Sequence, residues 1–184
     1  NSAIQHKFDN LSIGGRNLIK NSSPSSIDGW NLSNATNWSR ALVDCSQSPS
    51  GKAIRVTSNS TNSSITGGVY TSINPDLLDD GEEYTMSLYM RASKSMNIQL
   101  KNELTLANST HAISTEWKLY TFTGIIDKAR PLHSCVVYFN GSVETGDWYE
   151  FHSVKFEKGN KATAWSPAPE DYSTTTQMNS AIQQ

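Results

Sequence analysis

The sequence predicts an all-β fold, an antiparallel β-sandwich or barrel with a short helical segment at each end. Short runs with apolar side chains at every second position recur along the 184 residues, and Gly, Pro, Asn and Asp separate them. No long helical pattern lies between these runs. The length is that of one domain. Five Trp, seven Tyr and five Phe can fill its core, although only 36% of the residues are apolar.

The clearest alternation lies in residues 84–101, which are predicted to form a β-hairpin. Apolar and polar side chains alternate over 84–91 and again over 96–101, and a short polar turn separates the two runs. Because successive side chains of a strand point to opposite faces, one face of the hairpin is apolar. The other face carries an aromatic ring, two cations and two amides. It is either an ordinary solvated surface or a binding platform.

Other segments with strand patterns complete the predicted sandwich. They are residues 16–20, 30–43 (one or two strands), 52–57, 65–73, 116–126, 132–139 and 147–156. Residues 58–64 have nothing to bury and are predicted to be an exposed loop. The pair Gly67-Gly68 inside a strand predicts a bulge or a close approach of another group to the backbone.

The two ends of the chain share the pentapeptide Asn-Ser-Ala-Ile-Gln, at 1–5 and 179–183. Apolar residues at helical spacing predict helical linkers at 1–13 and 172–184, on either side of a body at 14–171. The repeat suggests one unit of a tandem array joined by these segments, as part of a longer protein. Helices this short need a partner, so a homotrimer through the ends is one expectation. Frayed ends are the alternative.

Composition argues against several classes of partner. The net charge is −2 and Lys and Arg are scattered, so nucleic acid is not an expected partner. No apolar run approaches the ~20 residues of a membrane span, so membrane insertion is not expected. Cys45 and Cys135 form either one disulfide or two buried thiols.

The sequence contains none of the common catalytic motifs. HExxH, CxxC, G-x-S-x-G and P-loop patterns are missing, and the four His have no metal-ligand spacing. A glycosidase needs two carboxylates that face each other across a cleft. Candidates exist at Glu82, Glu83, Glu103 and Glu150, but no pattern pairs them. An enzyme is therefore not expected.

Several stretches in a fixed order resemble a known family. Gly29-Trp30 is followed by the Tyr and Arg pattern of 84–91, by Glu116-Trp117-Lys118-x-Tyr120-x-Phe122 and by Trp148-Tyr149-x-Phe151-x-x-Val154. This set resembles jelly-roll carbohydrate-binding modules of the family 4/9/22 type, over roughly residues 15–158. The resemblance implies a jelly-roll β-sandwich whose concave sheet binds glycan.

A second pair of stretches is more specific. GRNLIKNS at 15–22 and FEKGNKATAWSPAPED at 156–171 are similar to carbohydrate-binding-type domains in tail, baseplate and fibre proteins of phages and prophages of Gram-positive bacteria. The resemblance implies a host-recognition role toward cell-wall or surface polysaccharide, beside other modules of the same tail protein. It also implies a place in the virion tail, after synthesis in the bacterial cytoplasm.

The same resemblance raises the question of a structural calcium ion. Modules of this type often bind one through ligands that include Asp near the last strand. The matching positions here hold His152 and Ser153, which are not the carboxylates that calcium prefers. Asp147 and Glu150 lie close in sequence. No cofactor is expected, and a structural calcium ion stays an open alternative.

In a jelly roll the second, fourth, fifth and seventh strands share one sheet, which corresponds here to ~38–43, 84–91, 95–101 and 134–140. Their polar faces combine aromatic rings, amides and cations, a mixture suited to sugars. The candidate carbohydrate-binding residues are Trp38, Arg40, Tyr89, Arg91, Asn97, Gln99, Lys101, Tyr138 and Asn140. Tyr70 and Trp148 are further candidates at loop edges. Trp30, Trp117 and Trp165 match positions that pack the fold.

The expected function is therefore that of a non-catalytic carbohydrate-binding module in a phage tail or receptor-binding protein, which mediates host adhesion. Two alternatives stay open. One is a structural spacer or trimerisation module of a tail fibre that binds no glycan. The other is a glycan-cleaving enzyme.

Overall fold

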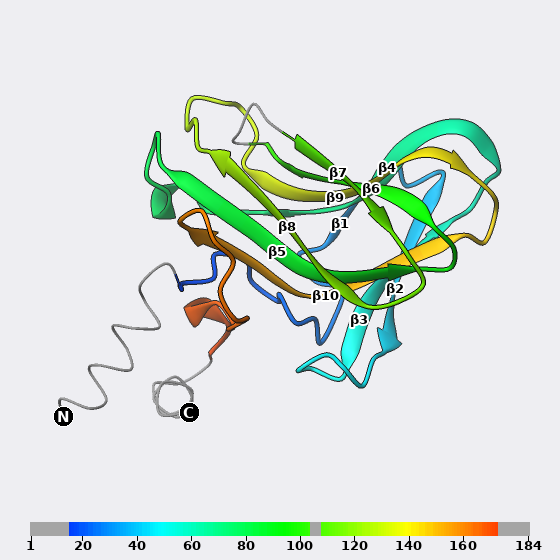
Figure 1. Ribbon diagram of the computed structural model, residues 1–184, viewed down its shortest axis with the longest axis horizontal. Coiled ribbons are helices and arrows are strands. Elements are labelled where there is room, and N and C mark those ends of the chain that lie inside the picture. The colour runs from blue at the N-terminus through cyan, green and yellow to red at the C-terminus, as the bar shows by residue number, and fades with distance from the viewer. Residues whose placement is uncertain (1–14, 104–107, 173–184) are drawn as a thin grey trace.

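The computed structural model describes residues 15–103 and 108–172, and these form a sandwich of two five-stranded antiparallel sheets (Figure 1). The all-β sandwich prediction is confirmed. The predicted helical linkers at 1–13 and 172–184 lie outside the described residues, apart from Tyr172.

Each sheet collects strands from distant parts of the chain. Sheet A has the order β1-β4-β9-β6-β7, with β1 (Asn31–Ser33), β4 (Asn62–Ser72), β9 (Ser134–Val143), β6 (Met96–Asn102) and β7 (Asn108–Ile113). Sheet B has the order β2-β3-β10-β5-β8, with β2 (Trp38–Asp44), β3 (Lys52–Ser58), β10 (Trp148–Lys158), β5 (Glu83–Ala92) and β8 (Lys118–Ile125). Two short 3-10 helices, η1 (Pro75–Leu77) and η2 (Pro169–Asp171), lie in the connections.

Most strand predictions are confirmed within a few residues, and the structure differs from the sequence analysis at three other places. Residues 16–20 form no strand; Leu18 N donates a single hydrogen bond to Phe156 O. The predicted loop at 58–64 already contains the start of β4. Strand β7 was not predicted, because Asn108–Ile113 is mostly polar and lies at the edge of its sheet.

The predicted hairpin at 84–101 is also wrong. Its two strands exist, as β5 and β6, but they belong to different sheets. β5 pairs with β10 and β8, whereas β6 pairs with β7 and β9. The short link between them crosses from sheet B to sheet A, and Ala92 N donates to Ser114 O at this corner, 2.9 Å away.

The core lies between the sheets and explains the apolar alternation. Met86, Leu88 and Met90 of β5 are fully buried there, as are Ile98 and Leu100 of β6. The hairpin interpretation therefore placed these side chains on the correct face of each strand, although it paired the strands with each other.

Gly67-Gly68 is a place of close approach, as predicted. A Cβ atom added at Gly67 would lie 2.5 Å from the Trp38 ring. One added at Gly68 would lie 2.1 Å from Tyr149 Oη and 2.7 Å from Val137 O. Gly68 also has φ +145°, which side chains rarely adopt. Only glycine lets the Tyr149 hydroxyl reach Val137 O, to which it donates a bond of 2.6 Å.

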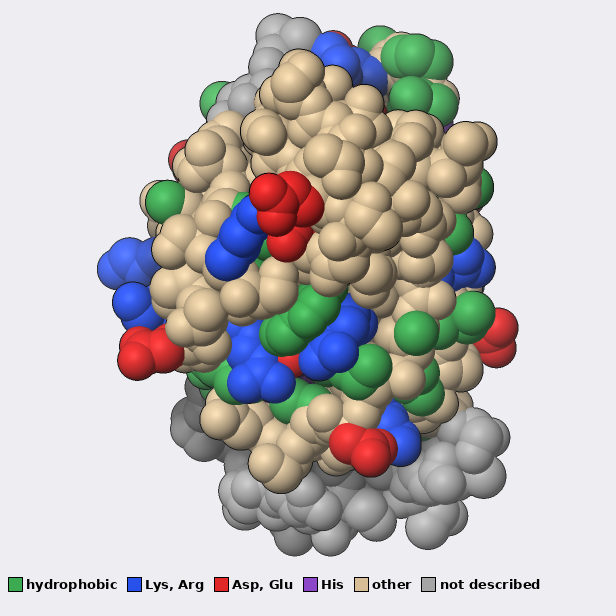
Figure 2. Space-filling model, turned by 90° about the vertical axis from the view of Figure 1, so that its right-hand side faces the viewer, with side chains coloured by type: hydrophobic (Ala, Val, Ile, Leu, Met, Phe, Trp, Pro, Cys, Tyr) green, Lys and Arg blue, Asp and Glu red, His purple; other side chains and the backbone are tan. Residues whose placement is uncertain are grey.

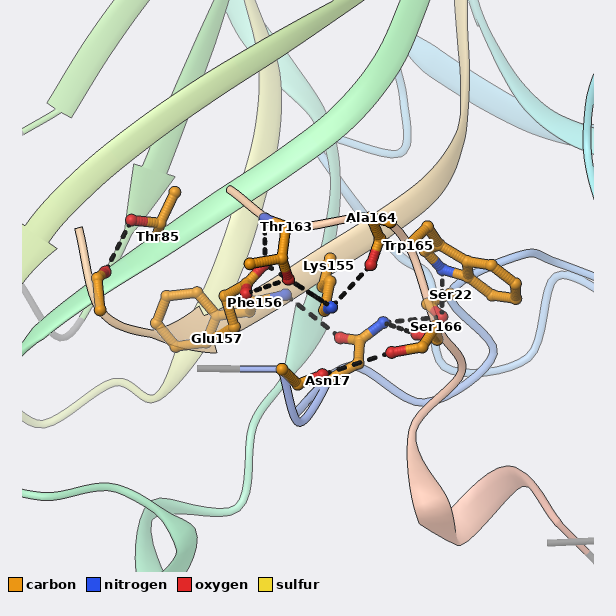
Figure 3. A network of polar contacts seen from close by, with 12 residues as sticks. Asn17, Ser22, Thr85, Lys155, Phe156, Glu157, Thr163, Ala164, Trp165 and Ser166 are labelled. Atoms are coloured by element: carbon orange, nitrogen blue, oxygen red, sulfur yellow. Dashed lines mark hydrogen bonds and ion pairs between the residues drawn. The ribbon is translucent and has the colours of Figure 1, made fainter. Parts of the chain in front are cut away.

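The side chain of Asn17 links the segment at 15–22 to β10 and to the segment at 156–171 through hydrogen bonds (Figure 3). Asn17 Nδ2 donates to Val154 O at 2.8 Å and to Ser166 O at 2.9 Å. Its Oδ1 accepts from Phe156 N at 3.1 Å. Trp165 contributes to the same joint, because its Nε1 donates to Ser22 Oγ at 3.1 Å. Asn17 is fully buried, so one amide ties the start of the body to β10 and to the segment after it.

Lys155, on the outer side of β10, holds the returning segment at a second point (Figure 3). Its Nζ donates to Thr163 Oγ1 and to Ala164 O, both at 2.8 Å, and Glu157 Oε2 lies 3.9 Å away. Burial lowers the pKa of Lys155, and the Glu157 carboxylate opposes that shift. Both ends of the described chain thus leave on the same side of the sandwich (Figure 1).

Candidate functional site

The nine predicted site residues do not form one patch. Asn97, Gln99, Lys101, Tyr138 and Asn140 lie on sheet A, whereas Trp38, Arg40, Tyr89 and Arg91 lie on sheet B. The assumption that their four strands share a sheet is wrong. The cause is the crossing after Ala92, since a link of this length serves either a hairpin or a change of sheet.

Trp38 and Arg40 are not on an outer face at all. Trp38 is 1% exposed, and its ring packs in the core at 5.4 Å from Phe139 and 6.4 Å from Tyr149. Arg40 lies two residues further along the strand and pairs with Val56, a core residue. It therefore occupies the core-facing side of the edge strand β2. The structure brings neither residue to a binding surface.

The five predicted site residues on sheet A lie on one continuous surface, the outer face of that sheet. Register places Ser33, Gly68, Tyr138, Gln99 and Thr110 in a row across all five strands. A neighbouring row holds Thr66 and Asn140, and Asn97 pairs with Ala112 beside it. On the same face, the row on the other side of Tyr138 holds Asn31, Tyr70, Val136 and Lys101. This set is called the tyrosine face below.

Tyr138 is the centre of the tyrosine face. Its hydroxyl is hydrogen-bonded to Ser33, which lies two strands away with Gly68 between them. Neighbouring strands are ~4.8 Å apart, so the side chain must extend across β4 to reach Ser33. Gly68 has no side chain to block that path. The side chain of Tyr138 therefore extends across β4 toward Ser33, and it is half-buried.

The electrostatics of Tyr138 agree with this half-buried position. Burial raises the pKa of its hydroxyl above 10.0, and the hydrogen bond with Ser33 opposes the shift. The nearby Glu103 carboxylate and the Tyr70 hydroxyl raise the pKa further. Tyr138 is thus a neutral phenol throughout the physiological range. It offers an apolar ring and one hydroxyl group.

Polar groups surround the ring. Thr66 Oγ1 donates to Asn140 Oδ1 at 3.3 Å, which orients that amide. Lys101 Nζ lies 3.5 Å from Glu103 Oε1. Asn97 is exposed and Gln99 is half-buried, so amide donors and acceptors flank the ring along β6. An aromatic ring with fixed amides around it can stack on the C–H face of a sugar and bind its hydroxyls.

Tyr70, a further candidate in the sequence, is half-buried on the tyrosine face. It pairs with Val136, which is only 1% exposed although its side chain points outward. Tyr70 and Lys101 flank Val136 in the register, and their long side chains account for that burial. Sequence reasoning missed Ser33 and Thr66, because short polar residues near turns carry no distinctive signal.

Tyr89 and Arg91 lie on the outer face of sheet B, which has a different character. The ring of Tyr89 is stacked on His152, with ring centres 5.2 Å apart and planes at 8°. Arg91 Nε donates to the buried Glu150 at 2.5 Å. Trp117, predicted to be a packing residue, contacts both Arg91 and His152. This surface is a tightly bonded cluster, whereas the tyrosine face is more open.

The residues near the last strand do not fit a calcium site. His152 Nδ1 is 2.8 Å from Ser153 Oγ, and neither supplies a carboxylate. Glu150 is held by Arg55 and Arg91, and Asp147 by Lys94 Nζ at 2.7 Å. Within 15–103 and 108–172, no three His, Cys, Asp or Glu side chains are placed to share a metal ion.

The carboxylates considered for catalysis lie apart. Glu103 follows β6 on sheet A, Glu150 is buried in β10 of sheet B, and Glu82 and Glu83 are exposed at the start of β5. The two cysteines are both buried and are not joined by a disulfide. No helix in the described part of the chain has the length and apolar character needed to cross a membrane.

Residues 1–147 match the family model for the carbohydrate binding domain of types 4 and 9. The chain belongs to this family of carbohydrate binding domains. No curated protein sequence matches it.

Three solved structures show the same fold at low sequence identity. An arabinose-bound α-L-arabinofuranosidase (MgGH51) aligns with a TM-score of 0.60 and 14% identity, over 82% of this chain and 28% of that one. TmCBM61 in complex with β-1,4-galactotriose aligns with a TM-score of 0.54 and 15% identity, over 78% of this chain and 99% of that one. The enzymatically active domain of bacteriophage CBA120 tailspike protein 4 aligns with a TM-score of 0.54 and 11% identity, over 79% of this chain and 22% of that one. The chain thus spans about a quarter of the enzyme chains and nearly all of the isolated module.

Proposed function

We propose that this chain is a non-catalytic module that holds a saccharide on the tyrosine face of sheet A. The observation that carries this proposal is the ring of Tyr138, whose side chain extends across β4 toward Ser33. A pyranose stacks its apolar C–H face on such a ring, and the amides of Gln99, Asn97 and Asn140 bind its hydroxyls. Membership of the carbohydrate binding domain family supports the same assignment.

We further propose that the module belongs to a tail or receptor-binding protein of a phage or prophage, located in the virion tail after synthesis in the bacterial cytoplasm. Its ligand is then a host cell-wall or surface polysaccharide. The end segments at 15–22 and 156–171 and the repeated pentapeptide support this context. The fold shared with a phage tailspike domain is compatible with it.

In such a particle, each site binds weakly and affinity comes from many copies. Neighbouring modules of the tail protein, or a homotrimer formed through the terminal segments, bring several tyrosine faces onto one polysaccharide. Linked sites of this kind raise overall affinity by roughly 10²–10⁴-fold without a new contact.

A glycan array and pull-down on host cell walls identify the ligand, and calorimetry then compares variants. We expect Tyr138→Ala to weaken binding about 10-fold, since an aromatic contact contributes roughly 0.5–1.5 kcal/mol beyond its buried area. Tyr138→Phe keeps the ring and loses only the bond to Ser33, so it should bind within about 3-fold of the wild type. Tyr172→Ala is the matched control, because it removes a tyrosine ring that lies outside both sheets.

Three results would contradict the proposal. Equal losses in Tyr172→Ala and Tyr138→Ala would move the site away from the tyrosine face. Failure of the wild type to bind any saccharide, on the array or on cell walls, would favour a structural spacer. Release of shortened glycan would show an enzyme.

A further inference from the structure

The outer face of sheet B carries a cluster that the proposed function does not use. Glu150 of β10 pairs in register with Arg55 of β3 on one side and with Arg91 of β5 on the other. Its carboxylate accepts from both Nε atoms, at 3.0 Å from Arg55 and 2.5 Å from Arg91. The side chain of Glu150 is 1% exposed, and those of Arg55 and Arg91 are 33% and 36% exposed. A buried carboxylate therefore fixes two accessible guanidinium groups side by side.

Two tryptophans hold the guanidinium planes in place. The Arg55 Cζ lies 3.9 Å from the ring centre of Trp148. The Arg91 Cζ lies 4.9 Å from the ring centre of Trp117 and 5.9 Å from that of Trp148. Contacts of this kind attract a cation to a ring and restrict the motion of its side chain. Figure 2 shows Lys and Arg side chains interleaved with hydrophobic ones on one end of the molecule.

The cluster has a net positive charge and N–H donors that its bonds to Glu150 do not use. Two guanidinium groups against one carboxylate leave an excess positive charge. Each arginine carries five N–H donors, and the bonds to Glu150 use only Nε. Within the described residues, the side-chain hydrogen bonds of both arginines come from Nε. The planar Nη edges match the two oxygens of a carboxylate.

A hollow of about 170 Å³ lies on the same face, further along β5. It is lined by Ser87, Tyr89, Leu119, Ser153, Ala162, Thr163, Ala164 and Trp165. Tyr89 is two residues from Arg91 on the same side of the strand, a separation of ~7 Å. The hollow is smaller than the ~300 Å³ of a usual ligand pocket, so it accepts one ring-sized group. Its rings and hydroxyl groups suit the two sides of a sugar.

We propose that this face is a second ligand site, specific for a saccharide that carries a carboxylate. The carboxylate binds the Nη edges of Arg55 and Arg91, and the adjoining sugar ring lies toward Tyr89 and the hollow. A planar carboxylate on a pyranose meets both parts of the surface at once. A glycerol phosphate chain offers the charge without the ring. This site is independent of the tyrosine face, so the two proposals can fail separately.

The test titrates the whole 184-residue chain with oligogalacturonate and with its methyl ester, by calorimetry at 20 and 300 mM NaCl. We expect the acid to bind and the ester to bind at least 10-fold more weakly, because esterification removes the charge. Higher salt should weaken binding of the acid, since the arginines are partly exposed. Equal binding of acid and ester would overturn the proposal. So would binding of poly(glycerol phosphate) without binding of oligogalacturonate.

Variants then locate the site. The double variant Arg55→Lys with Arg91→Lys keeps two cations beside Glu150 but removes the planar forks. We expect it to fold, with a thermal midpoint near that of the wild type, and to bind the acid about 10-fold more weakly. Lys118→Gln, which removes an exposed cation from β8, is the charge control and should bind normally. Unchanged affinity in the double variant, or an equal loss in Lys118→Gln, would overturn the assignment.

Discussion

The outer faces of the two sheets are built from the same kind of strand but in opposite ways. On sheet A, Tyr138 pairs with a glycine and is surrounded by amides that are exposed or half-buried. On sheet B, the polar groups are bonded to each other, and Glu150 and His152 are buried beneath aromatic and arginine side chains. Bonds between side chains therefore fix the groups of sheet B in place, whereas the outer face of sheet A presents a tyrosine ring and amides.

The difference arises from single positions in the register. In the outer row of sheet A, Gly68 carries no side chain, and the Tyr138 side chain extends across β4 toward Ser33. At the centre of sheet B, Glu150 sits between two arginines, so a charge network fills the corresponding space. Variants at Gly68 and Glu150 therefore test the difference between the two sheets most directly.

Gly68→Ala should have the largest effect. Its new Cβ would overlap Tyr149 Oη and Val137 O, and φ is +145°. Strain and displacement of buried groups together are expected to lower the free energy of unfolding by roughly 3 kcal/mol or more. Urea denaturation measures this loss.

Gly81→Ala is the matched control for that prediction. Gly81 also has positive φ, at +80°, but nothing lies within 4 Å of an added Cβ. Its cost should be about 1 kcal/mol, the conformational penalty alone. Equal destabilisation by the two variants would show that close approach at Gly68 does not matter.

Glu150→Gln is expected to have the next largest effect, confined to sheet B. The variant leaves Arg55 and Arg91 beside each other without their shared carboxylate. Breaking a fully buried pair costs roughly 3–5 kcal/mol, and the partial exposure of both arginines reduces the expected loss to about 2 kcal/mol. Chemical denaturation of the folded chain gives the value.

Glu103→Gln tests the same change on sheet A. Its carboxylate lies 3.5 Å from Lys101 Nζ and is 15% exposed. That pair is longer and has a single cation, so the loss should stay below about 1 kcal/mol. A larger loss in Glu103→Gln than in Glu150→Gln would reverse the contrast drawn between the two faces.

The sequence was sufficient to predict which face of most strands is buried, but not which strands are neighbours. Apolar alternation identified the core side of β5 and β6 correctly. The chain between 92 and 96 contains nothing that separates a hairpin from a crossing between sheets. The tyrosine face could therefore be predicted only in part, from β6 and β9, and Tyr89 and Arg91 were added to it by the pairing error.

The alternation of side chains along β10 contains part of the information needed to predict the cluster on sheet B. In Trp148–Lys158, Tyr149 and Phe151 alternate with Glu150 and His152. Charged and titratable side chains on the outer side of a central strand need partners, because burial without them is costly. That argument predicts partners for Glu150. It does not identify Arg55 and Arg91, which depend on long-range register.

The pH dependence of stability should also distinguish the two faces. His152 is 3% exposed, and burial lowers its pKa from 6.5 to about 4, with Glu150 opposing the shift. Between these values the unfolded chain binds a proton that the folded chain does not. Stability is therefore lost as pH falls from about 6.5 toward 4, by roughly 1–2 kcal/mol from this group.

Urea midpoints from pH 7.5 to 4.5 for the wild type and His152→Gln isolate this contribution from the other acidic groups. The slope should be shallower in the variant, because it lacks the proton uptake on unfolding. His111→Gln is the control at sheet A, where burial also lowers the histidine pKa but the side chain is less buried. Binding of a neutral saccharide should stay constant over the same range, since the pKa of Tyr138 is raised above 10.0. Parallel slopes in the wild type and His152→Gln would show that His152 is protonated as readily in the folded chain as in the unfolded one.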